Sequence, residues 1–168
     1  VVDVFLDIPD VVGVLSLLLV AVHALRMYDW FVPGTFRAPL LWSLYLGYGF
    51  LVLGFLLKAL SVWLDVPPTL AVHAFTFGGI GLMTLGMMAR VSLGHTGRNV
   101  FAPPRVVTPL FVLLLVGASV RVILPLIDPG QYLLWIEISQ VLWMLAYGGF
   151  LVVFLPMLTR PRVDGRPG

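Results

Sequence analysis

Cysteine is absent from this chain of 168 residues, and charged residues are scarce. Without thiols the chain cannot form a disulfide, ligate haem through a thiolate, or hold an iron–sulfur cluster or a Cys-based zinc site. A metal would therefore be bound by His, Met, carboxylate or backbone groups. Charged residues make up 11% of the sequence, against about 25% in soluble domains, and the formal net charge is only +2. No basic face suited to nucleic acid is present, so we expect no nucleic-acid partner.

Apolar residues, in contrast, make up 60% of the chain and gather in five long runs. Each run is near the roughly 20 residues that a helix needs to cross a hydrocarbon core of ~30 Å. The runs are continuous rather than alternating in polarity, which argues against a membrane β-barrel, and Pro and Gly mark the connections. We predict an all-α, polytopic transmembrane bundle in the lipid bilayer, a single domain of residues 1–168. The predicted spans are about 11–28, 39–64, 70–91, 107–127 and 132–157.

The basic residues predict an orientation. If the helices alternate in direction, Lys58 and Arg121 lie toward one side of the membrane, and the other basic residues fall on the opposite side: Arg26, Arg37, Arg90, Arg98, Arg105, Arg160, Arg162 and Arg166. The positive-inside rule makes that second side cytoplasmic, so the N-terminus faces outward and the C-terminus inward. The early residues Asp3 and Asp7 agree with this. A start of this kind lacks the form of a signal peptide, and we expect the chain to be the C-terminal part of a longer protein.

His73 lies just inside the outer end of the third predicted span. A polar ring in hydrocarbon is unfavourable unless it is hydrogen-bonded or ligated, so His73 is a candidate haem ligand. Ala74, Gly78 and Gly81 follow at i, i+4 and i+7 of a helix, where they would form a smooth stripe. Such a stripe admits either a flat macrocycle or a second helix backbone. Ligation of His73 and ordinary small-residue packing both stay open.

Three charged residues are expected at about the same depth as His73: Lys58, Arg121 and Glu137. Isolated charges are disfavoured at this depth, so they should pair or face a polar cavity. A haem on His73 would offer its two propionates to Lys58 and Arg121 through charge-assisted hydrogen bonds. The alternative is an ion pair between Arg121 and Glu137, with Lys58 extending to the interface.

The third span ends in the sequence Ala-Arg-Val-Ser-Leu-Gly-His-Thr-Gly-Arg, residues 89–98. Gly94 is a candidate helix C-cap and Gly97 a turn residue, while Arg98 is typical of a membrane anchor, yet none of these roles explains His95. An anion-binding loop that uses Arg98 is a further, weaker interpretation.

Two histidines remain as candidate ligands besides His73. His95 lies 22 residues after His73, about 33 Å along a straight helix, so the two cannot share one iron. His23 could join His95 on the cytoplasmic side in a bis-histidine centre. Alternatively, His23 is a core residue bonded to a backbone carbonyl, and we favour this interpretation.

The Leu-Gly-His-Thr-Gly-Arg exit and the terminal sequence of residues 161–168, Pro-Arg-Val-Asp-Gly-Arg-Pro-Gly, resemble the NnrS family of bacterial inner-membrane proteins. The resemblance covers nearly the whole chain, although the earlier spans of the family are missing. It implies haem b and copper as cofactors and a role in the response to nitric oxide or its detoxification. It also implies that the missing N-terminal spans or a partner subunit complete the protein. The cofactor-binding candidates are His73, His95, His23, Lys58, Arg121, Arg98, Gly78 and Gly81.

Copper has its own candidate ligands, because Met83 and Met87 lie at i and i+4 in the third span and thioethers suit Cu(I). Packing between helices explains the same pair more simply. No Ser, His and acidic residues at one depth form a catalytic set, so enzyme activity and catalytic residues stay unassigned. Two other classes remain open: a transporter or channel component that uses the outer polar cluster, and a structural subunit of a larger membrane complex.

Overall fold

The computed structural model describes residues 8–165, so the expectations for Asp3, Asp7 and Arg166 lie outside the described residues. Across residues 8–165 the chain is helical and contains no strand. The helical segments are α2 (Pro9–Asp29), η1 (Thr35–Arg37), α3 (Pro39–Trp63), α4 (Pro68–His73), η2 (Ala74–Ile80), α5 (Gly81–His95), α6 (Val107–Ile127), η3 (Pro129–Gln131) and α7 (Tyr132–Leu158).

Five of the stretches are long and apolar enough to cross a membrane, which confirms the predicted polytopic α-helical class: Pro9–Asp29, Pro39–Trp63, Pro68–His95, Val107–Ile127 and Pro129–Leu158. Proline begins α2, α3 and α4. It suits the first turn of a helix because the N–H that it lacks has no partner there. The third span is longer than predicted, since the helix continues beyond residue 91 to His95.

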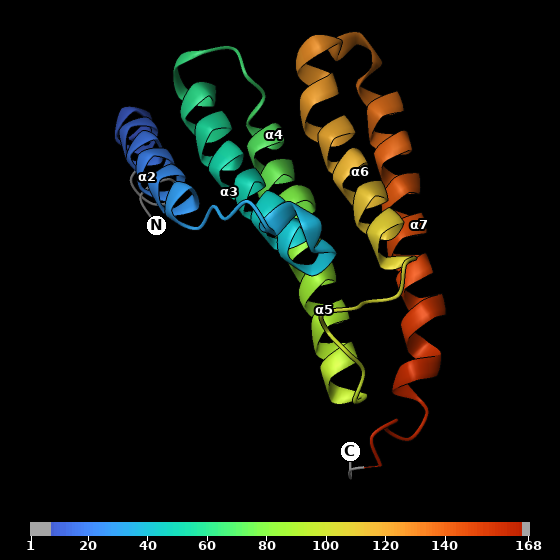
Figure 1. Cartoon of the computed structure of the whole chain (residues 1–168). Coiled ribbons are helices and arrows are strands. Elements are labelled where there is room, and N and C mark those ends of the chain that lie inside the picture. Colours follow the sequence, from blue (N-terminus) through green and yellow to red (C-terminus); the bar gives the residue numbers. More distant parts are fainter. Residues whose placement is uncertain (1–7, 166–168) are drawn as a thin grey trace.

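The spans form two hairpins on either side of a central helix (Figure 1). The hairpin α2–α3 lies on one side of the continuous helix α4–η2–α5, and the hairpin α6–α7 lies on the other. Within the described residues, α2 packs against α3 alone, whereas the central helix contacts both hairpins. Fully buried Leu82, Leu85, Leu114, Phe111 and Phe154 fill the space between the central helix, α6 and α7.

The central helix changes its hydrogen-bonding pattern at η2, which is a π-helix. In a π-helix each turn is wider than in an α-helix, and such turns are frequent at functional sites. Two glycines inside η2 let α3 approach closely: the ring of Phe50 lies against Gly78, and Leu51 lies against Gly79. The π-helix begins directly after His73, and it carries Phe77, whose ring lies near Arg121.

Candidate functional site

His73 is the last residue of α4 and precedes the first residue of the π-helix. Its side chain is half-buried. In the part of the chain that the structure describes, its ring makes no hydrogen bond, so the nitrogen atoms of the ring are not committed to a protein partner. An imidazole without a partner inside a membrane span is an unusual feature that calls for a ligand or for solvent.

Arg121 of α6 lies within electrostatic range of His73 and faces α7 and the π-helix. Its Nη1 donates long hydrogen bonds to the Ile136 carbonyl, at 3.4 Å, and to Ser139 Oγ, at 3.3 Å. The guanidinium carbon lies 5.8 Å from the centre of the Phe77 ring. The Nε atom is buried and has no hydrogen-bond partner. The guanidinium is therefore only partly satisfied, since good N–H···O bonds are about 2.9–3.0 Å long.

No carboxylate neutralises Arg121 among residues 8–165. Glu137 of α7 is exposed and forms no ion pair with it. The alternative of an Arg121–Glu137 pair is therefore wrong in this structure, because Arg121 turns toward the backbone carbonyl of Ile136 and the hydroxyl of Ser139. A groove of about 380 Å³ borders the guanidinium and is otherwise lined by Phe77, Gln140, Trp143 and Met144. We call this groove, with His73 and Ser139, the Arg121 site.

Lys58 does not belong to the Arg121 site. It lines a different groove, of about 650 Å³, between α2, α3 and α4, together with Phe55, Phe75 and other residues. The structure therefore brings Arg121 close to His73, but it does not gather Lys58 and Arg121 around one opening. The position of Lys58 along α3 was predictable from sequence, whereas the side of the helix that it occupies was not.

The small-residue stripe is occupied by protein. A Cβ added to Gly78 would overlap the ring of Phe50, and one added to Gly81 would lie 3.9 Å from Leu114. The carbonyl of Gly81 also accepts a hydrogen bond of 3.0 Å from the Tyr147 hydroxyl of α7. Of the two interpretations, the structure shows close helix packing at Gly78 and ordinary van der Waals contact at Gly81.

His23 is held on α2 by aromatic residues of α3. Its Nδ1 lies 2.5 Å from Tyr48 Oη, and its ring stacks on Phe55 with 5.4 Å between ring centres. The partner is thus a tyrosine hydroxyl, and the expected backbone carbonyl is a wrong prediction. Since α2 makes no contact with α5 in the described residues, the structure does not bring His23 and His95 together.

The end of α5 has a well-defined cap. Gly97 has φ 73°, its N–H bonds to the Gly94 carbonyl at 3.2 Å, and the N–H of Arg98 bonds to the Leu93 carbonyl at 2.9 Å. These bonds form a Schellman motif, in which the left-handed residue directly follows the helix cap. Gly94 therefore lies inside the helix, and Gly97 is the residue that ends it. The Arg98 side chain has a buried Nη1 atom without a partner.

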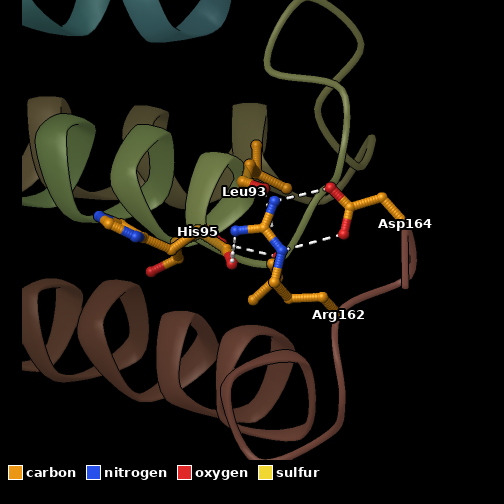
Figure 2. A network of polar contacts seen from close by, with 6 residues as sticks. Leu93, His95, Arg162 and Asp164 are labelled. Carbon is orange, nitrogen blue, oxygen red and sulfur yellow. Dashed lines mark hydrogen bonds and ion pairs between the residues drawn. The ribbon is translucent and has the colours of Figure 1, made fainter. Parts of the chain in front are cut away.

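The C-terminal segment packs against this helix end (Figure 2). Arg162 Nη1 donates to the His95 carbonyl at 3.0 Å, and Arg162 Nη2 forms an ion pair of 2.6 Å with Asp164. The hydrogen bonds with Asp164 raise the pKa of Arg162. The ring of His95 points away from this network and is exposed. The contact thus uses the backbone of His95 and leaves its imidazole accessible.

Met83 and Met87 both line a third groove, of about 710 Å³, with Trp30, Tyr45 and Tyr48. The two thioethers therefore share one opening, as their spacing predicts. Among residues 8–165 no cluster of three or more His, Cys, Asp or Glu side chains is placed to hold a metal ion. Copper binding at Met83 and Met87 stays a prediction.

Sequence reasoning missed several residues around these sites. Phe77 and Ser139 contact Arg121, and Tyr147 bonds to the central helix just after the π-helix. A tyrosine in the middle of an apolar span is a signal that could have been used, because its hydroxyl requires a partner there. Arg162 and Asp164 belong to the quoted terminal sequence, but nothing in their spacing indicates contact with His95.

The chain matches a family model described as NnrS protein over residues 1–162. No curated protein and no solved structure matches the chain.

Proposed function

The chain belongs to the NnrS family, and from this membership we propose that it is a membrane protein of the nitric oxide response that binds haem b through His73. Membership of the family suggests a role related to nitric oxide, and the five apolar helices make the chain a membrane protein. The bacterial inner membrane is the location that we propose. The haem, its ligand and its environment are inferences from the residues of the Arg121 site.

The observation that carries the proposal is the unpartnered imidazole of His73. In the described part of the chain no hydrogen bond holds its ring, although the residue lies in a membrane span and is half-buried. Unsatisfied polar groups are unfavourable in hydrocarbon, so a residue of this kind is expected to serve a ligand. Haem iron accepts a neutral imidazole nitrogen as an axial ligand.

Arg121 supports the proposal independently. It carries a permanent positive charge, it borders an apolar and aromatic groove, and no carboxylate among residues 8–165 neutralises it. A haem propionate would supply the missing negative charge and would occupy the donors that Arg121 now uses poorly. One histidine and one arginine thus fit one axial ligand and one propionate. Lys58 lies on another groove, so we do not assign it to the second propionate.

When bound, haem would supply an iron centre at which nitric oxide can coordinate. The protein residues would have separate tasks: His73 would hold the iron, Arg121 would orient the macrocycle through a propionate, and Phe77, Trp143 and Met144 would line the groove beside it. No other histidine of residues 8–165 lies at the depth of His73. A second protein ligand would therefore come from other spans of the protein or from a partner subunit.

Haem titration of the purified chain in detergent tests the proposal. We expect a Soret band in the unmodified protein and its loss in His73→Ala. Arg121→Gln should keep the band but weaken haem affinity by about 10- to 150-fold, because a hydrogen bond to a charged group contributes about 1.5–3 kcal/mol.

The matched control is His95→Ala, which removes an exposed histidine at the opposite end of the same helix. This variant should retain the Soret band. If His73→Ala binds haem as tightly as the unmodified chain, or if His95→Ala alone abolishes binding, the assignment of His73 is wrong.

A further inference from the structure

Two arginines converge on a small pocket at the end of the bundle where α2 connects to α3 and α5 connects to α6. Arg37 ends the short helix η1, and Arg90 lies on α5, five residues before its last residue. Both line one pocket of about 130 Å³. The remaining wall is formed by residues at the start of α3 and by residues of the α5–α6 connection, among them Leu40, Phe101 and Pro103.

Among residues 8–165, no acidic residue lines this pocket. Within residues 8–165 neither Arg37 nor Arg90 forms an ion pair, and neither guanidinium has a hydrogen-bond partner. Both side chains are exposed, and two permanent positive charges that line one small pocket repel each other. The other residues of the pocket wall are mainly apolar, since Leu40 is buried and the connection contributes proline and phenylalanine. An anion between the two guanidinium groups would remove the repulsion.

The geometry of the two guanidinium groups and the volume of the pocket favour a phosphate group. Guanidinium groups present planar pairs of donors that match the oxygens of a phosphate group, and two of them can bind one phosphate from two directions. The volume admits a compact anion but not a macrocycle. The first turn of α3 adds a weaker contribution of the same sign, because the N-terminal end of a helix carries a partial positive charge.

The position of the pocket identifies the source of the phosphate. Pro39 begins an apolar span, so Arg37 lies where a helix enters the membrane. Phe101, which lines the pocket, is 90% exposed, so its apolar ring is free to enter the lipid interface. Basic pockets between transmembrane helices bind the headgroups of acidic lipids. We propose that Arg37 and Arg90 bind the phosphate of an acidic phospholipid.

Titration of the purified full chain in neutral detergent with phosphatidylglycerol, followed by native mass spectrometry, tests this site. We expect tighter binding of phosphatidylglycerol than of phosphatidylcholine. Each of Arg37→Gln and Arg90→Gln should weaken binding of phosphatidylglycerol about 5-fold, and the double variant about 25-fold, at about 1 kcal/mol per basic residue. The double variant Arg37→Lys with Arg90→Lys should retain more affinity than the double Gln variant.

The matched control is the double variant Arg105→Gln with Arg160→Gln, which removes the same charge from exposed arginines that do not line the pocket. It should leave the affinity for phosphatidylglycerol nearly unchanged. Equal losses in the two double Gln variants would overturn the site, because only the net charge would then matter. Displacement of phosphatidylglycerol by inorganic phosphate at equal concentration would also overturn it in favour of a soluble ligand. Haem binding by these variants should be normal, so failure here is separate from failure at His73.

Discussion

At Gly97 the backbone has φ 73°, in the left-handed region that other L-residues rarely adopt. The same residue lies close to the C-terminal segment, because a Cβ placed there would be 2.8 Å from Asp164 Cγ. Gly97 therefore has two roles, since it ends α5 and leaves room for Asp164. Three residues earlier, Gly94 has ordinary helical surroundings, with nothing closer than 4.0 Å to an added Cβ.

Gly97→Ala should consequently lower the free energy of unfolding by about 1–2 kcal/mol, through an unfavourable φ and the overlap with Asp164. Gly94→Ala should leave the free energy of unfolding unchanged or raise it by up to about 1 kcal/mol, since alanine favours a helix interior over glycine. Unfolding in mixed detergent, followed by circular dichroism, measures both. The account of the cap is wrong if the two variants have the same stability.

The π-helix η2 packs closely against α3. Glycines on one helix allow another helix to approach closely, and in membranes this close packing replaces much of the hydrophobic driving force. In η2 the space above Gly78 is filled by the ring and Cβ of Phe50. Since η2 follows His73 directly, this contact also fixes the rotation of the segment that carries Phe77 toward Arg121.

We expect Gly78→Ala to destabilise the protein by about 1–3 kcal/mol, because the added methyl group must displace Phe50 or separate η2 from α3. The preference of helices for alanine would, by itself, predict the opposite sign. Gly148→Ala provides the comparison, as an added Cβ at Gly148 has no atom within 4 Å. Thermal unfolding of both variants in the same detergent decides between packing and intrinsic preference.

For the molecule as a whole, burial is uneven among the spans. Half of the apolar window of the central span is buried, against 17% in Pro9–Asp29 and 17% in Pro129–Leu158. The first and last spans therefore present wide apolar faces to lipid or to other helices. Lipid is as apolar as these side chains, so such faces are stable in a bilayer without a protein partner.

The orientation of the whole bundle is a further prediction. The absence of cysteine makes single-cysteine labelling straightforward. In intact cells with the outer membrane permeabilised, a membrane-impermeant maleimide should label Asp128→Cys, in the α6–α7 connection, and should not label Arg160→Cys, after α7. Disruption of the inner membrane should make Arg160→Cys reactive. Labelling in the reverse order would show that the positive-inside assignment is inverted.

Sequence patterns were sufficient for the number, type and approximate limits of the spans. The reason is that the length of an apolar run and the position of proline act locally, so that Pro9, Pro39 and Pro68 begin helices whatever the neighbouring segments do. The family could also be identified from the Leu-Gly-His-Thr-Gly-Arg exit. The approximate positions of His73, Arg121 and Lys58 along their helices followed from the count of residues in each apolar run.

The neighbours of these residues, in contrast, are decided by how the helices pack together. A helix can rotate about its axis without any change in depth, and the fold alone places Arg121 beside His73 and Lys58 on another groove. The α-helical period assumed for Ala74, Gly78 and Gly81 did not include a π-helix. The π-helix packs against α3, and the apolar period of the sequence does not distinguish its wider turn from an α-helical one. Likewise, His23 meets Tyr48 and Arg162 meets His95 across 25 and 67 residues of chain, distances at which only tertiary packing selects the partner.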